Sequence, residues 1–335
     1  MDSDTDKKII SAFLKGSVLG LAEEGTSAEY IQTQISHIFL YSHTVYKLYR
    51  RDNENFNALF ADLSGEKRAD FYKEDFFYNH YFNPAVYKKL VGVLVHDNEV
   101  ILTEASAGLD WAIEMARIDA AENLTALLIH GSLKEDDFRS IGYQMTKTLA
   151  EFPRKSDTKN NWYAIMKANF EDNESFVYLA DPLIKKDDTR KVLEVLKNYF
   201  ENGKERFVNM TGEQLICAID NHSDNVFYNG GEVSFIDVYL PKENWRMIDP
   251  FYAVCRLSAD VLVLGGNTYA EALISGYEDY YGNDKTSRSI QLFYQLDGAL
   301  IKAAYLYIIG KDSGKRLNEA EKYWQFIMSS ISELK

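Results

Sequence analysis

The spacing of apolar residues changes near Met115–Asp119, and this change divides the chain into a strand-rich part and a helix-rich part. Before it, residues 30–51, 88–105 and 109–118 combine β-branched and aromatic side chains with partial alternation, which is typical of strands. Segments 6–17 and 66–82 have helical spacing instead, and most segments after the change do too. We therefore expect an α+β fold, with an antiparallel sheet plus helix in residues 1–116 and mainly helices in residues 117–335.

Turn residues divide the strand segments further. Ser42–His43 is expected to join two strands within 30–51, and His96–Asn98 to join two more within 88–105. The helix at 66–82 is expected to end near Asn83–Pro84, because the residue before a proline disfavours helical backbone.

The composition indicates a folded soluble protein. The chain has 335 residues, of which 46% are hydrophobic, enough for one large domain or two lobes. The N-terminus has no secretory signal, and the most apolar stretches, 254–266 and 296–310, are short and carry charge, so no membrane span is expected. Cys217 and Cys255 lie in apolar runs and are interpreted as reduced core thiols of a cytoplasmic protein. The net charge of −14 disfavours nucleic acid and anionic membranes as partners.

One polar segment, "AIDNHSDNVFYNGGEVSFIDVYLP" at 218–241, interrupts the helix-rich part. Asp220 and Asn225 are five residues apart, and Asp237 follows twelve residues later, beyond a turn at 229–231. The pattern predicts an acidic loop, a strand, a tight hairpin turn and a second strand that ends at Asp237. This arrangement suits phosphoryl transfer: Asp220 would orient a substrate hydroxyl, while Asn225 and Asp237 would offer oxygen ligands to the Mg²⁺ of ATP.

The first part of the chain supplies the other groups that a kinase needs, in the required order. Lys47 ends a predicted strand, where a lysine can reach the α- and β-phosphates. Glu74 on the following helix is the acid expected to hold Lys47, with Asp75 as the less favoured neighbour. The strand at 109–118 then runs into the boundary between the two parts, where backbone groups could bind adenine.

Five segments carry a resemblance to a known family. They are "QTQISHIFLYSHTVYKL", "FYKEDFFYNHYFNPAVYKKLVGV", "DWAIEMARI", "IDNHSDNVF" and "FIDVYLPKENWRMIDPFYAVCRLSADV", and together they span Gln32 to Val261. In these segments the chain resembles the aminoglycoside phosphotransferase family, within the protein-kinase-like fold. It is most similar to the branch in which a P-loop ATPase domain often follows, but it contains no GxxxxGK[ST] motif, so that domain is not expected here.

The resemblance implies a bilobal fold and a role for each of these residues. Residues 1–116 would form the N-terminal nucleotide-binding lobe, and 117–335 the C-terminal catalytic and substrate-binding lobe. Lys47 would bind ATP phosphates and pair with Glu74; Met115, Ala116 and Arg117 would form the hinge; Asp220 would be the catalytic base; Asn225 and Asp237 would hold Mg²⁺. Asp249 would brace the catalytic loop from the following helix.

The chain departs from the family pattern at two loops. Ala218-Ile219-Asp220 stands where the family has His-Gly-Asp, and the next five residues replace a loop with Leu-His and a Pro-Gly pair. No glycine-rich phosphate loop precedes Lys47, so Ser42 and the backbone amides of its turn are the expected phosphate contacts.

The function expected from these observations is phosphate transfer from ATP, or another nucleoside triphosphate, to a hydroxyl group of a small molecule. The acceptor is expected in a groove of the C-terminal helices that includes residues 275–284. The altered loop at Asp220 keeps a nucleotide-binding pseudokinase open as the alternative. A kinase-like domain acting on a protein, or transferring another nucleotide group, is a third interpretation. A metallohydrolase using Asp220, His222 and Asp224 is a fourth.

Overall fold

A computed structural model gives the fold, and it describes residues 3–33, 35–51, 65–152, 162–180, 184, 186–211, 216–217, 220–282, 286–311, 314 and 316–334. The chain divides into two compact units. The first unit comprises residues 1–120 and 235–242, and the second comprises 121–234 and 243–335. The predicted parts, 1–116 and 117–335, do not include this return of 235–242 to the first unit.

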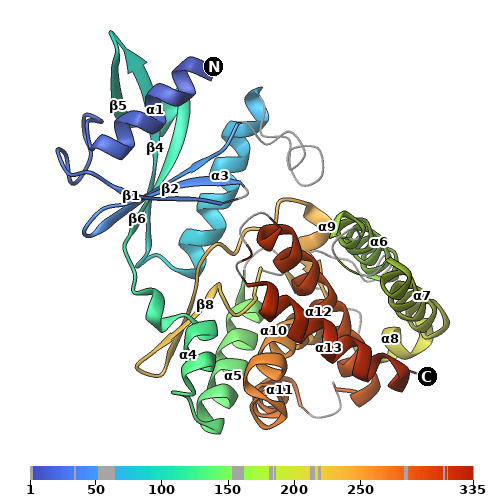
Figure 1. The fold of residues 1–335 in the computed structure, drawn as a ribbon. Helices are drawn as coiled ribbons and strands as arrows, with labels where there is room; N and C mark the ends of the chain where they lie inside the picture. The colour runs from blue at the N-terminus through green and yellow to red at the C-terminus, as the bar shows by residue number, and fades with distance from the viewer. Residues whose placement is uncertain are drawn as a thin grey trace. The chain divides into compact units, whose positions relative to one another are not determined.

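The first unit contains one antiparallel sheet of six strands in the order β1-β2-β3-β6-β4-β5 (Figure 1). The strands are β1 (Glu29–Gln32), β2 (Ser36–Leu40), β3 (Thr44–Tyr49), β4 (Tyr87–His96), β5 (Glu99–Glu104) and β6 (Asp110–Ala116). The predicted turns near 42–43 and 96–98 are confirmed. Segment 30–51 holds three strands and not two, because Thr33 forms a further turn in which its Oγ1 accepts from the N–H groups of Ile35 and Ser36.

Helices α1 (Ser3–Lys15) and α3 (Gly65–Phe82) pack on opposite faces of this sheet (Figure 1). Tyr46 and Leu48 of β3 share a buried cluster with Phe13 of α1, whereas Tyr49 shares one with Tyr72 of α3. Since neighbouring side chains of a strand alternate between faces, Lys47 between them lies on the α3 side of the sheet.

The returning segment 235–242 is anchored to the end of α3. The amide of Asn83 donates to the carbonyl oxygen of Phe235 at 3.2 Å, and the Val238 N–H donates to Asn79 Oδ1 at 2.9 Å. α3 ends before Asn83–Pro84, as predicted. The helix end therefore contributes directly to the placement of Asp237, which lies between these two anchors.

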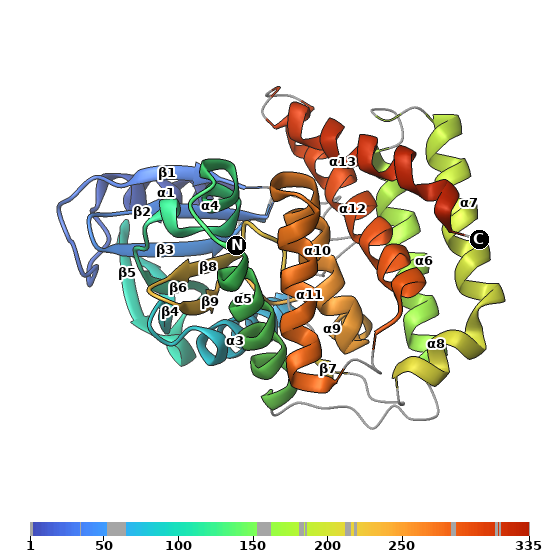
Figure 2. The ribbon, with the colours of Figure 1, turned by 90° about the horizontal axis from the view of Figure 1, so that it is seen from below.

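The second unit is mainly helical, and the fold class is α+β as expected. Its helices are α4 (Leu124–His130), α5 (Glu135–Glu151), α6 (Trp162–Ala180), α7 (Lys186–Asn202), α8 (Lys204–Thr211), α9 (Glu243–Arg246), α10 (Pro250–Gly265), α11 (Asn267–Tyr281), α12 (Arg288–Gly310) and α13 (Leu317–Ser330). α10 packs against α11 and α12, and α12 packs against α13 (Figure 2). Short strands β7 (Ile216–Cys217) and β10 (Met247–Ile248) form one pair, and β8 (Val226–Asn229) and β9 (Glu232–Phe235) form another.

The β8–β9 hairpin is the one predicted from the sequence. Gly230 and Gly231 join the strands and both have positive φ, +59° and +88°, which glycine adopts without strain. Ala218 and Ile219, which precede Asp220, lie outside the described residues.

Helix α10 begins at a capped proline. Asp249 is its N-cap, where the side chain accepts from the Phe251 N–H at 2.7 Å, and Pro250 occupies the first turn.

Within the part of the chain that the structure describes, α12 alone is long and apolar enough to cross a membrane, but 67% of its most apolar window is buried inside the protein, as in a core helix. Cys255 is a buried free thiol, while the side chain of Cys217 lies outside the described part.

Candidate active site

Lys47 and Asp237 form an ion pair within the first unit. Lys47 is only 4% exposed, whereas the Asp237 side chain is 50% exposed. A solvent-accessible ligand could therefore reach Asp237 more easily than Lys47. The Asp237 N–H donates to the Tyr87 hydroxyl at 2.7 Å. The φ of Asp237 is +51°, a left-handed conformation that aspartate tolerates better than most residues.

Asp75, and not Glu74, is the acid of α3 that acts on Lys47. Asp75 is fully buried and its Oδ1 accepts from Asn79 Nδ2 at 2.9 Å, whereas Glu74 is half-buried. Burial lowers the pKa of Lys47, but the carboxylates of Asp237 and Asp75 outweigh it and raise that pKa. Burial raises the pKa of Asp75 to about 6, against the opposing effect of Lys47.

The buried face of α3 is partly polar, so the spacing of apolar residues does not reveal that Asp75 lies on it. The buried side chains include Arg68, Tyr72, Asp75 and Asn79, which share one helical face at spacings of three and four. Apolar and aromatic spacing, the signal used in the sequence, favoured a face that includes Tyr81, which is 40% exposed.

The predicted hinge residues Met115, Ala116 and Arg117 lie at and just after the end of β6. Met115 pairs with Val45 on one side and Tyr87 on the other. The Ala116 N–H donates to the Val86 carbonyl and the Arg117 N–H to the His43 carbonyl, both at 2.8 Å. These two amides therefore already donate to acceptors within the first unit.

The turn expected to contact phosphate is bound by a carboxylate of the protein itself. Glu23 accepts from the N–H groups of Ser42, His43 and Thr44 at 2.8–2.9 Å, and from the Thr44 hydroxyl at 2.7 Å. The Thr44 hydroxyl and these amides lower the pKa of Glu23 to about 2. In this structure the turn therefore has an internal acceptor, and the contact of Ser42 and these amides with phosphate stays a prediction.

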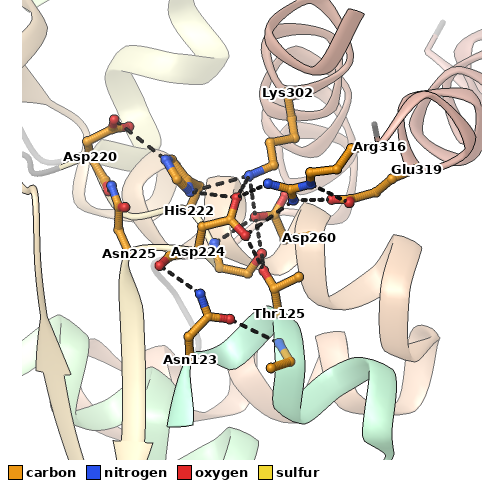
Figure 3. Close-up of polar contacts among 12 residues, drawn as sticks. Asn123, Thr125, Asp220, His222, Asp224, Asn225, Asp260, Lys302, Arg316 and Glu319 are labelled. Carbon is orange, nitrogen blue, oxygen red and sulfur yellow. Dashed lines mark hydrogen bonds and ion pairs between the residues drawn. The ribbon is translucent and has the colours of Figure 1, made fainter. Parts of the chain in front are cut away.

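The second unit folds residues 220–225 into a compact loop (Figure 3). Asn225 Nδ2 donates to the backbone oxygen of Asp220 at 2.9 Å, and the Asn225 N–H donates to the His222 carbonyl at 2.9 Å. Arg256 on α10 donates through Nη2 to Asp220 Oδ1 at 3.0 Å. The structure thus brings Asp220 and Asn225 together, and Arg256 orients the Asp220 carboxylate.

A charged cluster contacts this loop; it consists of Asp260 on α10, Lys302 on α12 and Arg316 just before α13 (Figure 3). Asp224 Oδ2 accepts from Lys302 Nζ at 2.8 Å and from Arg316 Nη1 at 2.9 Å. Asp260 Oδ2 accepts from the N–H and hydroxyl of Ser223 at 2.7 and 2.8 Å. Burial opposes the charge on Asp224, but Lys302 and Arg316 hold its pKa far below the ordinary value.

The acid that braces the loop is therefore Asp260 and not Asp249. Asp249 instead caps its own helix and accepts from the Tyr294 hydroxyl at 2.9 Å. The sequence reasoning missed Asp260, Arg256 and Lys302. The one available signal was their placement as isolated charges in the most apolar stretches, 254–266 and 296–310, because a buried charge needs a partner.

Comparison with solved structures gives the fold a precedent. The chain superposes on choline kinase LicA from Streptococcus pneumoniae with a TM-score of 0.55 and 13% identity, covering 99% of this chain and 100% of that one. The AMP complex of LicA matches with a TM-score of 0.53 and 13% identity, covering 99% and 98%. The GDP complex of an aminoglycoside 2'-phosphotransferase matches with a TM-score of 0.51 and 11% identity, covering 99% of both chains. No protein-family model matches this chain, and no curated protein is significantly similar to it in sequence.

The chain has the protein-kinase-like fold of these enzymes. The resemblance seen in the sequence is confirmed at the level of fold.

The metallohydrolase interpretation used Asp220, His222 and Asp224 as metal ligands, and the contacts of the two aspartates do not support it. Asp220 contacts Arg256, and Asp224 contacts Lys302 and Arg316, so both carboxylates already have cationic partners. Among the residues that the structure describes, no group of three or more His, Cys, Asp and Glu side chains is arranged to hold a metal ion.

A narrow cavity of about 50 Å³ lies in the second unit between α6, α7 and α12. Phe170, Phe200 and Phe293 contribute to its walls, and Asp297 lines it with a carboxylate whose pKa burial raises to about 6. It is far smaller than the roughly 300 Å³ of typical small-molecule pockets. Its lining includes no residue of 275–284, the segment predicted to contribute to the acceptor groove.

Proposed function

We propose that this chain is an ATP- and Mg²⁺-dependent phosphotransferase that acts on a hydroxyl group of a small molecule. The observation that carries the proposal is the arrangement of Lys47, Asp237 and Asp75 in a protein-kinase-like fold. A buried lysine with one interior and one half-exposed carboxylate can exchange the exposed partner for a phosphate and keep the interior one. The names of the matched enzymes and their AMP and GDP complexes support a nucleotide donor and a small-molecule acceptor.

In the first unit, Lys47 would bind the α- and β-phosphates while Asp75 holds its ammonium group in place. Asp75 takes the role predicted for Glu74. Met115, Ala116 and Arg117 would contact the nucleotide base through carbonyl oxygens, given that two of their amides donate within the sheet.

In the second unit, Asp220 would orient the acceptor hydroxyl and accept its proton. Arg256 holds Oδ1, which assigns this task to Oδ2. Asn225 uses Nδ2 on the backbone of Asp220, so its Oδ1 would be the Mg²⁺ ligand that the second unit offers. The Asp237 carboxylate would be the Mg²⁺ ligand that the first unit offers. These oxygen donors fit Mg²⁺, and the ion would supply positive charge at the phosphates when bound.

The remaining expectations follow from the sequence. We propose a cytoplasmic protein whose partners are the nucleotide and the acceptor, with no nucleic-acid or membrane partner, because the net charge is −14. The acceptors to test first are amino alcohols and aminoglycosides, after the names of the matched enzymes.

The test combines binding and turnover. ATP with Mg²⁺ should raise the melting temperature more than ATP alone, with about 2.7 kcal/mol of stabilisation at a hundredfold excess over Kd. Phosphate transfer to one acceptor of the panel should be lost in Asp220→Asn and Lys47→Met. Lys89→Met, an exposed lysine on the same sheet, is the matched control and should retain activity.

The outcomes separate the candidates. Stabilisation by Mg²⁺-ATP without turnover on any acceptor would favour the pseudokinase, for which the contact of Arg256 with Asp220 is the supporting observation. If Mg²⁺-ATP gives no stabilisation and no acceptor is phosphorylated, both candidate functions are contradicted.

A further inference from the structure

Lys302 is a buried charged residue for which the proposed function has no role. It lies on α12, is 5% exposed and interrupts an apolar stretch. Its Nζ donates to Asp224 Oδ2 at 2.8 Å and lies 3.3 Å from Nδ1 of His222 (Figure 3). Burial lowers the pKa of Lys302, but the carboxylates of Asp260 and Asp224 outweigh it and raise that pKa, so the side chain remains an ammonium group.

The contact between Lys302 and His222 determines which ring nitrogen carries the proton. An ammonium group has donors only, so Nδ1 of His222 must act as the acceptor. A ring nitrogen that accepts a hydrogen bond carries no proton, so the ring is neutral and not an imidazolium. Since a neutral imidazole has one N–H group, that group is on Nε2.

The Nε2–H group faces the carboxylate that we assign as the catalytic base. Nε2 lies 3.7 Å from Asp220 Oδ2, and the other oxygen of that carboxylate is held by Arg256. In the opposite tautomer, Nδ1–H would face Asp224 Oδ2, which is also 3.7 Å away. The Nε2 lone pair would then face Asp220 and repel it, so the tautomer decides whether His222 attracts or repels the base.

We propose that Lys302 is a positioning residue, which fixes His222 as the Nε2–H tautomer and so holds Asp220 between this N–H group and the Arg256 guanidinium. All four side chains belong to the second unit. The consequence for catalysis rests on the proposed function, whereas the tautomer itself can be measured without any activity.

The decisive measurement is a proton–nitrogen correlation spectrum of the full chain labelled with ¹⁵N-histidine, because ring nitrogen shifts differ between the tautomers and the imidazolium. The chain has six histidines, and the signals lost in His222→Gln identify that ring. We expect Nε2–H at His222 in the wild-type protein and a shift towards Nδ1–H in Lys302→Met. An Nδ1–H ring or an imidazolium in the wild type would overturn the proposal, and this result needs no variant to fold.

Arg316→Met is the matched control. Arg316 binds the same Asp224 carboxylate as Lys302, but it donates to Asp224 and Glu319. The control should therefore keep the Nε2–H tautomer. An unchanged tautomer in Lys302→Met, or the same change in both variants, would show that Lys302 does not fix it.

Kinetics test the positioning role separately. Lys302→Met and His222→Gln should each lower kcat about 10- to 100-fold, with a change in the nucleotide KM of no more than about twofold. The double variant should be no slower than the slower single variant, because both act through one N–H group. Additive losses would contradict a joint role. Absence of phosphate transfer by the wild type would refute the proposed function. The spectra would then still test the tautomer of His222, because they do not depend on activity.

Discussion

Asp75 and Glu74 are neighbours in sequence but lie in different surroundings on α3, and this difference makes a matched test. Asp75→Asn removes the buried carboxylate whose charge raises the pKa of Lys47, and we expect kcat/KM for Mg²⁺-ATP to fall about 10- to 100-fold from the loss of this electrostatic interaction. Glu74→Gln should change it by less than about threefold, because Glu74 is half-buried and is not one of the carboxylates that raise the pKa of Lys47. Steady-state kinetics with varied nucleotide measures both. A larger loss in Glu74→Gln would instead indicate that Glu74 is the acid that holds Lys47, as the sequence predicted.

Glu23 gives a prediction for pH. Its folded pKa is lowered to about 2 from an ordinary 4.5, so its carboxylate contributes stability that is fully present above about pH 5 and is lost as the pH falls towards 2. Glu23→Gln should therefore be less stable than the wild type in urea at pH 7, and the gap should narrow as the pH falls through that range. The neighbouring, exposed Glu24→Gln should show neither effect. A gap that stays constant with pH would mean that ionisation of Glu23 does not contribute.

The residues of the site differ in how far the sequence could predict them. Strand position and a fixed local spacing single out Lys47, Asp220 and Asn225 in the sequence, and their roles in phosphate transfer stay predictions. Asp75 and Arg256 could not be found in this way, since their roles depend on which side chains meet in three dimensions. The acceptor of the 42–44 amides could not be found for the same reason, because nothing local indicates that Glu23, about twenty residues earlier, accepts from them.

At the scale of elements, α5 and α11 cross where two glycines meet. A Cβ on Gly142 would lie 2.0 Å from the Leu273 backbone oxygen, and one on Gly276 would lie 2.1 Å from the Arg139 backbone oxygen. Helix propensity alone favours alanine over glycine by about 1 kcal/mol. The clash with backbone outweighs this, and we expect Gly142→Ala and Gly276→Ala each to lower the free energy of unfolding by about 2 kcal/mol or more in urea denaturation.

The control for this crossing is Thr268→Ala, an exposed position in the first turn of α11, which should stay within about 0.5 kcal/mol of the wild type. Stability of Gly142→Ala at or above the wild-type value would mean that the helices do not approach so closely.

The sequence predicted the strands, turns and the Gly230–Gly231 hairpin from local periodicity and turn chemistry. It could not predict this crossing, because the two glycines are 134 positions apart and each looks unfavourable within its own helix.

At the scale of the whole molecule, the first unit is not one continuous piece of sequence, since it needs residues 235–242. Local patterns predict elements in chain order, and they give no sign that the chain rejoins the first unit for a few residues at the end of β9. Without this segment, Lys47 loses its ion pair with Asp237, Tyr87 loses the donor from the Asp237 amide, and Asn79 loses the Val238 amide. Val238 itself is fully buried, so its absence also leaves apolar surface exposed.

We therefore expect residues 1–120 alone to be less stable than residues 1–120 joined through a flexible linker to 235–242, by about 2–4 kcal/mol for a buried valine and two hydrogen bonds. Urea denaturation of the two chains measures the difference. The joined chain carrying Val238→Asp is the control and should fall back towards the shorter chain, because a charge would occupy a buried apolar position. The joined chain carrying Asp237→Asn should lose less, since the Asp237 side chain is half-exposed and its backbone amide remains. Equal stability of the short and joined chains would mean that the sheet and α3 form a complete unit and that 235–242 only rests against it.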